Sequence, residues 1–127
     1  MHRAVYDTRF FIEFYYSKDD ETLQRMKEEK KRRDKFISTV VIHEVYKLTL
    51  AREGRETAAL RTTLLKQDFK VASVTAEVAE ISAELRHKYN LSMADSMIAA
   101  TVSSLKADCV SDDPHFKHIK EINTIWV

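Results

Sequence analysis

The sequence has very little of the residues that interrupt regular structure: its 127 residues include one glycine, Gly54, and one proline, Pro114. Linkers rich in glycine or proline are therefore excluded, and the loops must be short or built from other polar residues. There is also one cysteine, Cys109, which excludes an internal disulfide and fits a reducing compartment. We expect a single domain over residues 1–127.

Long apolar runs and an excess of one charge are also missing. No segment approaches the ~20 apolar residues of a membrane helix, and the start, MHRAVYD, is not a signal peptide. We therefore expect a cytoplasmic protein. Charged residues make up 32% of the chain but leave a net charge of +1, so the overall charge predicts no nucleic-acid partner and any basic surface must be local. The hydrophobic share of 44% is enough for a sizeable core.

Short apolar or β-branched runs alternate with longer segments of helical periodicity. We expect strands at residues 3–6, 35–38, 69–73, 108–111 and 124–127. Apolar residues recur at helical spacing between these runs, for example over residues 78–89 and 94–105. The alternation predicts an α/β fold with a mostly parallel sheet. In such sheets, functional sites collect at the carboxyl ends of the strands.

Two acidic residues directly follow expected strands. Asp7 follows the first strand, in AVYDTRF, and Asp113 follows the fourth, in CVSDDPHF. Either can cap a helix, since Thr8 can begin one after Asp7 and Pro114 suits the first helical position after Asp113. Both also lie at the sheet edge where a site is expected, and a capping role does not exclude a second role.

Two further acids lie inside expected helices. Asp95 fits a capping box in which Ser92 is the N-cap, and periodicity does not tell which edge of the sheet Asp95 faces. Glu44 lies more than a turn inside its helix, so it has no capping role. Its spacing puts it on the flank of the core-facing stripe, with a surface ion pair to Lys47 as the alternative.

The segments around these acids resemble the four acidic motifs of the PIN-domain nucleases, most closely the small VapC-type toxins of toxin–antitoxin pairs. The matching segments are YDT, STVVIHEVYKL, LSMADSMIAAT and CVSDDPHF, which keep the family's order and spacing and cover nearly the whole chain. The resemblance implies a PIN-like three-layer α/β/α sandwich with a sheet of roughly five strands. It implies four catalytic, metal-binding acids and two supporting hydroxyls: Asp7, Glu44, Asp95 and Asp113, with Thr8 and Ser111.

The resemblance implies a metal-dependent endoribonuclease that hydrolyses RNA phosphodiester bonds, with one or two Mg²⁺ or Mn²⁺ ions as cofactor. Such hard cations prefer oxygen ligands and offset the repulsion between carboxylates and a phosphate. It also implies a homodimer that binds a small antitoxin. The alternative is a catalytically silent PIN-like domain that binds RNA or a protein partner. A third alternative is a signalling domain of the receiver type, which also has an α/β sheet with carboxylates at the strand ends. It would leave Glu44 without a role.

Three residues depart from the family's pattern. Arg9 stands where asparagine or serine is usual, and it is a candidate phosphate contact or a surface ion-pair partner. His115 stands where a further aspartate is common. Asp112 is an alternative fourth ligand, and we prefer Asp113 because it keeps the family's two-residue step from Ser111.

Two other features have simpler explanations. His115 and His118 lie near Cys109, but there is no second cysteine pair, so we do not expect a zinc site. A Cys–His nucleophile is not expected either, because Cys109 lies in a strand that should be buried. The aromatic run at 10–16, FFIEFYY, should pack in the core or at a dimer contact.

Overall fold

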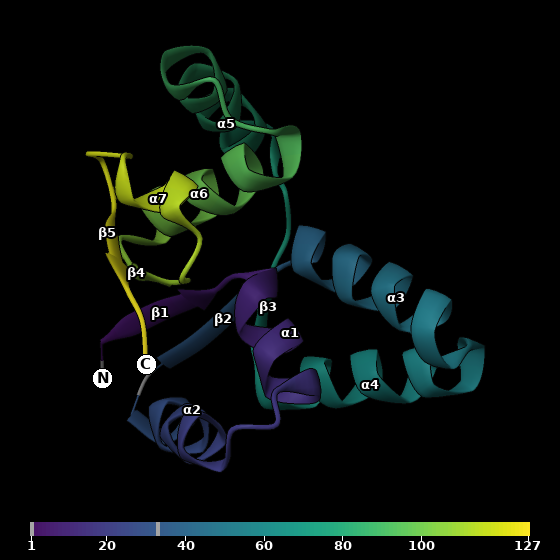
Figure 1. Cartoon of the computed structure of the whole chain (residues 1–127). Coiled ribbons are helices and arrows are strands. Elements are labelled where there is room, and N and C mark those ends of the chain that lie inside the picture. The colour runs from purple at the N-terminus through teal and green to yellow at the C-terminus, as the bar shows by residue number, and fades with distance from the viewer. Residues whose placement is uncertain (1, 33) are drawn as a thin grey trace.

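The computed structural model, which describes residues 2–32 and 34–127, has a parallel sheet surrounded by helices (Figure 1). The strands are β1 (Arg3–Tyr6), β2 (Asp34–Ser38), β3 (Lys70–Ala72), β4 (Asp108–Val110) and β5 (Asn123–Ile125). The helices are α1 (Thr8–Tyr16), α2 (Asp20–Arg32), α3 (Thr39–Glu53), α4 (Arg55–Asp68), α5 (Ala76–Tyr89), α6 (Met93–Leu105) and α7 (Pro114–Lys117). Each expected strand is present, and the predicted α/β fold is confirmed.

The order of the strands creates a crevice at one edge of the sheet. They pair as β3-β2-β1-β4-β5, and every pair is parallel. The chain proceeds outward from β1 to β3 on one side and from β4 to β5 on the other, so its direction reverses between β1 and β4. At such a reversal, the connections after the two strands diverge and open a crevice at their carboxyl ends. Asp7 follows β1 and Ser111 follows β4, so both residues lie at this crevice.

Helices cover both faces of the sheet. In Figure 1, α6 lies above the strands and α2 below them, which makes the sheet the middle of three layers. Tyr6 of β1 is fully buried, and its ring packs edge-on against Phe10 of α1 and Phe69 before β3. On α6, Ile98 and Val102 are fully buried. Burial of one such aliphatic side chain contributes roughly 1.5–3 kcal/mol, so these contacts fix α6 against the strands.

The single glycine lies between two helices that form an antiparallel hairpin, α3 and α4 (Figure 1). Gly54 has φ +89° and ψ 176°, a conformation that side chains with a Cβ rarely adopt. Its N–H donates to the carbonyls of Thr49 and Leu50 and closes α3. The chain therefore uses its one glycine where the backbone geometry requires it.

Two predictions about the interior are confirmed by burial. Phe10 and Phe11 of the aromatic run lie in the core. Cys109 is fully buried in β4, as its place in an apolar strand predicts, and burial raises the pKa of its thiol. Within residues 2–32 and 34–127, no helix is both long enough and apolar enough to cross a lipid bilayer.

Candidate metal centre

Four elements bring acidic side chains to the crevice. Asp7 follows β1, Asp113 follows β4, and Glu44 is on α3, which begins directly after β2. Asp95 is in the first turn of α6, which joins β4 through a short turn. The last turn of α6 lies beside the start of β4, so the opposite end of the helix, its first turn, lies at the carboxyl ends of the strands. This geometry places Asp95 on the same side as the other acids, which periodicity alone did not decide.

Asp7 is a buried carboxylate that does not cap the helix after it. It occupies the N-cap position of α1 without a side-chain capping bond, and 3% of the residue is exposed. The hydroxyl of Ser111 donates to its Oδ2 at 2.7 Å. Burial raises the pKa of Asp7 to about 6, with smaller contributions from the charges of Asp95 and Glu44, while the bond from Ser111 opposes the rise. Asp7 therefore occupies the N-cap position as predicted, but its side chain makes no capping bond to α1.

Glu44 is held by a hydroxyl from the neighbouring element. The hydroxyl of Thr8 donates to Glu44 Oε1 at 2.6 Å, which joins α1 to α3. Glu44 is half-buried, as its position on the flank of the apolar stripe predicts. In the described part of the chain, its carboxylate accepts this bond instead of forming the ion pair with Lys47. Thr8 and Ser111, the two candidate supporting residues, therefore each donate to a different acid.

Asp95 combines a helix-capping position with contact to the other acids. Its backbone N–H donates to Ser92 Oγ at 3.2 Å, so Ser92 is the N-cap of α6 as the pattern predicts. Its half-buried carboxylate faces the crevice. Burial raises the pKa of Asp95, and the charges of Asp113 and Glu44 raise it further, whereas His115 lowers it. The four acids thus form one electrostatically coupled group.

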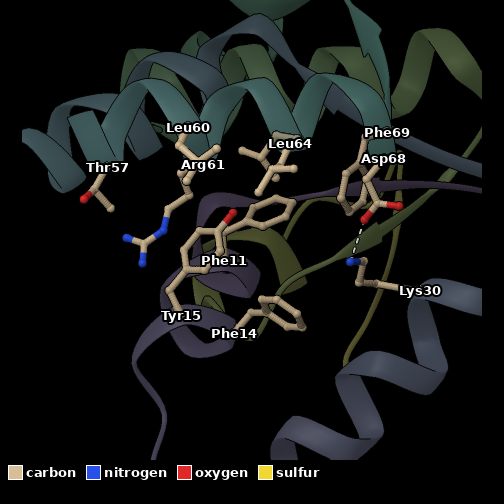
Figure 2. Close-up of a pocket in the computed structure, with 11 residues that line it drawn as sticks. Phe11, Phe14, Tyr15, Lys30, Thr57, Leu60, Arg61, Leu64, Asp68 and Phe69 are labelled. Carbon is tan, nitrogen blue, oxygen red and sulfur yellow. Dashed lines mark ion pairs between the residues drawn. The ribbon is translucent and has the colours of Figure 1, made fainter. Parts of the chain in front are cut away.

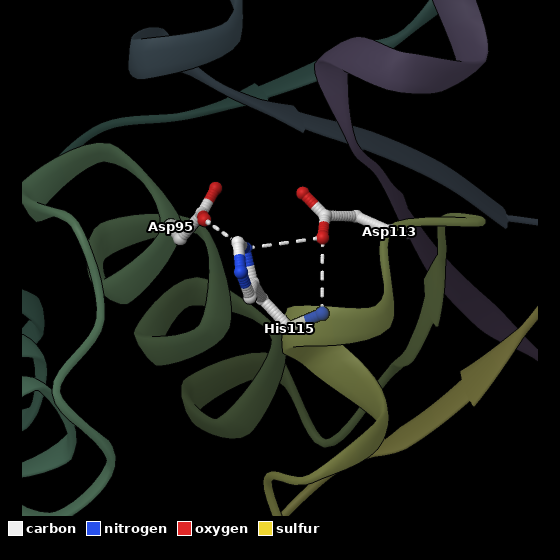
Figure 3. Close-up of side chains that lie close together, drawn as sticks. All are labelled: Asp95, Asp113 and His115. Carbon is white, nitrogen blue, oxygen red and sulfur yellow. Dashed lines mark hydrogen bonds and ion pairs between the residues drawn. The ribbon is translucent and has the colours of Figure 1, made fainter.

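The two adjacent aspartates after β4 have different surroundings. Asp112 forms a bidentate ion pair with Arg9, at 3.0 and 3.3 Å. Asp113 instead caps α7 by accepting the backbone N–H of His115 at 2.9 Å, and its own N–H donates to Ser111 Oγ at 3.0 Å. Its Oδ1 also lies 3.2 Å from Nδ1 of His115 (Figure 3). Of the two aspartates, Asp113 is therefore the one that joins the other acids.

The chemistry of the donor atoms fits a divalent cation. Asp95, Asp113 and His115 each present a ligand atom, and these atoms lie within 4.8 Å of one another. Asp7 and Glu44 are not among these grouped atoms, but Asp7 lies near enough to Asp95 for the charge of Asp95 to raise its pKa. The sequence identified the three aspartates, whereas His115 was noted as a departure from the family's pattern and as part of a zinc site that was not expected. Its position two residues after Asp113, on a one-turn helix, is the signal that could have placed it here.

Comparison with known proteins decides the family. A family model described as "PIN domain" matches residues 4–122. The chain belongs to the PIN-domain family. This is a family of nucleases, and the match includes all four candidate acids of the PIN domain described above. Comparison of the sequence with curated proteins gives no match.

Solved structures of the same fold cover almost the full length of this PIN domain. DNA-bound VapBC from Salmonella typhimurium matches with a TM-score of 0.81 and 17% identity, over 99% of this chain and 98% of that one. VapBC2 from Rickettsia felis matches with a TM-score of 0.81 and 15% identity, over 98% of each chain. VapC20 from Mycobacterium tuberculosis, described as a sarcin–ricin loop cleaving toxin, matches with a TM-score of 0.75 and 20% identity, over 94% of this chain and 98% of that one. These similarities show the fold.

Proposed function

We propose that this PIN domain is a divalent-metal-dependent endoribonuclease and the toxin of a toxin–antitoxin pair. One observation carries the proposal: Asp7, Glu44 and Asp95 come from separate elements, and the charges of the last two raise the pKa of the first. Carboxylates that converge in this way repel one another, and a divalent cation removes that repulsion. Such a cation is also what hydrolysis of an anionic phosphodiester requires.

The acids have distinct roles in this proposal. Asp7, Asp95 and Asp113 would hold the principal ion, and Glu44 would complete the site or orient the attacking water. When bound, the ion supplies Lewis-acid chemistry that activates water and neutralises charge on the phosphate.

The hydroxyls of Ser111 and Thr8 act through the acids they contact. Ser111 fixes the carboxylate of Asp7 and opposes the rise in its pKa, and Thr8 fixes the carboxylate of Glu44. Such supporting bonds hold acidic groups in the orientation and charge state that a cation needs.

The RNA substrate is supported by the resemblance and by one of the similar structures, the sarcin–ricin loop cleaving toxin. Arg9 is on the rim of the crevice, with its guanidinium held by Asp112. In this proposal Arg9 contacts a phosphate of the bound RNA, which requires it to exchange its partner. The ion pair between Arg9 and Asp112 is partly exposed and therefore weak, so little free energy is lost when Arg9 leaves Asp112 for a phosphate.

Cleavage of single-stranded RNA tests the proposed activity. Wild-type protein should cut RNA when Mg²⁺ or Mn²⁺ is present and stop when a chelator is added. Asp7→Asn should lower the rate at least about a hundredfold, because it removes a charge at the reacting centre. Asp20→Asn is a matched control, since Asp20 is exposed on α2, and it should leave the rate unchanged. RNA that binds without being cut under any metal condition would contradict the activity and favour the catalytically silent alternative.

A groove lined mainly by apolar side chains lies between α1, α2 and α4 and has a volume of about 400 Å³. Figure 2 shows aromatic side chains of α1 facing Leu60 and Leu64 of α4, with an ion pair between Lys30 and Asp68 at one end. Leu60 is 61% exposed and Leu64 is 53% exposed. Together with the apolar lining of the groove they form a contiguous exposed apolar patch, a feature that often marks a protein–protein interaction site.

We propose that this groove binds an apolar segment of the antitoxin. The similar structures from Salmonella typhimurium and Rickettsia felis are complexes of this fold with a second protein, VapB. Leu60 and Leu64 are 61% and 53% exposed, so a partner that buries them would gain roughly 1–2 kcal/mol from each side chain. The homodimer implied by the resemblance belongs to the same proposal, and light scattering should give a mass near twice 14.8 kDa.

A further inference from the structure

His115 directs one ring nitrogen at the candidate acids. Its Nδ1 lies 3.2 Å from Oδ1 of Asp113 and 3.7 Å from Oδ2 of Asp95, so it lies between the two carboxylates (Figure 3). The side chain is 69% exposed, which means that burial in the core does not account for this orientation. Two acids and an imidazole therefore meet at one point at the edge of the crevice.

The spacing of these three groups suits a shared ion. An octahedral ion with bonds of about 2.1 Å separates its ligand atoms by roughly 3–4.2 Å. The donor atoms of Asp95, Asp113 and His115 lie within 4.8 Å of one another, so side-chain movements of less than about 1 Å would bring them to such distances.

The backbone holds His115 beside the carboxylate it faces. Its N–H donates to Oδ1 of Asp113 at 2.9 Å, and this bond also begins α7. The same two residues are thus joined through the backbone and through the imidazole. Because the bond fixes the start of α7, the ring needs only rotation about its side-chain bonds to reach an ion.

We propose that His115 is a nitrogen ligand of the metal ion and makes the site prefer first-row transition ions such as Mn²⁺ to Mg²⁺. This inference rests on the proposed function, because it concerns the ion which that function requires. Mg²⁺ takes oxygen ligands and rarely gives up its water, whereas first-row transition ions accept imidazole more readily. An aspartate at this position, which the resemblance implies is common, would give an all-oxygen site.

Electron spin echo modulation tests the ligand directly. The full-length protein, freed of metal and loaded with Mn²⁺, should show modulation from a coordinated ¹⁴N nucleus. His115→Asp should bind Mn²⁺ without this modulation. His118→Gln is the matched control, because His118 lies three residues on and lines the same small cavity beside Asp95, but is not among the grouped ligand atoms. It should keep the modulation.

Calorimetry on the same proteins tests the preference. The ratio of the Mg²⁺ to the Mn²⁺ dissociation constant should fall about tenfold or more in His115→Asp and stay unchanged in His118→Gln. Bound Mn²⁺ without nitrogen modulation in the wild type would overturn the inference and leave the proposed function intact, as would an unchanged ratio. A wild type that binds neither ion would overturn both. A wild type that shows the nitrogen modulation but does not cleave RNA would contradict the proposed function alone.

Discussion

At the scale of single residues, the surroundings of Asp7 support the proposed cation. It is almost completely buried, it accepts one hydroxyl bond, and two other carboxylates lie near enough to raise its pKa. A buried carboxylate in this position favours its neutral form until a positive charge arrives. We therefore expect the carboxylate of Asp7 to lower the stability of the metal-free protein near neutral pH, and in the proposed function it is a ligand of the ion.

Asp7→Asn should stabilise the metal-free protein in a pH-dependent way. The pKa of Asp7 is raised from 3.8 to about 6 in the folded state, so folding favours the protonated form. Protonated Asp7 therefore stabilises the folded protein. This contribution to the free energy of unfolding is complete below about pH 4 and is lost as the pH rises through about 6. Above that pH the variant should be more stable than wild type by on the order of 1–3 kcal/mol, and near pH 4 the two should match. Urea denaturation with a chelator measures both. A less stable variant at neutral pH would show that the carboxylate has a structural role.

Asp112 and Asp113 should respond differently to the same substitution. Asp113→Asn removes a charge that acts on Asp95, so it should reduce Mn²⁺ affinity and RNA cleavage as strongly as Asp7→Asn. Asp112→Asn weakens only the partly exposed ion pair with Arg9, so Mn²⁺ affinity should change by less than about fivefold. Calorimetric titration of both variants with Mn²⁺ makes the comparison. Equal losses in the two would mean that the fourth ligand is misassigned.

At the scale of elements, the site depends on where helices begin. Both α6 and α7 start with a capping side chain, Ser92 and Asp113, at the carboxyl edge of the sheet. Helix N-termini carry partial positive charge, which favours nearby carboxylates. Capping and ion binding are therefore compatible, since the bond that begins α7 also orients the carboxylate of Asp113.

Gly54→Ala should destabilise the hairpin of α3 and α4 through the backbone alone. A Cβ added at Gly54 meets no atom within 4 Å, so sterics with other residues do not contribute. Its φ of +89° and ψ of 176° should cost alanine roughly 1–3 kcal/mol. Asn90→Ala is the matched control, because Asn90 has φ 54° and ψ 48°, a left-handed conformation more open to other residues. Chemical denaturation should show the larger loss for Gly54→Ala, and equal losses would contradict the backbone explanation.

At the scale of the whole molecule, the candidate metal centre and the apolar groove are built from different residues. The acids come from the carboxyl edge of the sheet, whereas the groove lies between α1, α2 and α4. The molecule thus presents one anionic surface suited to an ion and one apolar surface suited to a protein. Substitutions in the groove should therefore leave metal binding unchanged, and substitutions in the metal centre should leave protein binding unchanged.

Leu64→Asp should abolish antitoxin binding and leave RNA cleavage unchanged. Leu64 lines the groove and is already 53% exposed, so a charge there disrupts docking more than folding. Leu50→Asp is the matched control, because Leu50 is also exposed, at 42%, but does not line the groove. Co-purification with an antitoxin of the VapB type, co-expressed with each variant, measures binding. Wild-type binding by Leu64→Asp would exclude the groove as the docking site.

The local sequence was enough to predict most elements and their order. Strand 3–6 was predicted with its observed bounds, and the strand predicted at 124–127 was observed as β5, Asn123–Ile125. These predictions succeed because apolar periodicity and capping residues act over a few neighbouring positions. No local pattern predicts the groove. Its walls come from helices that are distant in the chain, and some of its lining residues, such as Leu60, lie outside the core.

The sequence by itself determined the α/β class, the alternation of strands and helices, and the four acidic motifs that indicate the family. Only the tertiary structure decided which carboxylates meet. It turned Asp95 toward the crevice, paired Asp112 with Arg9, and brought His115 against Asp113 and Asp95. The physical reason is that helix and strand preferences are set by neighbouring residues, whereas distances between side chains far apart in the chain depend on how whole elements pack against the sheet.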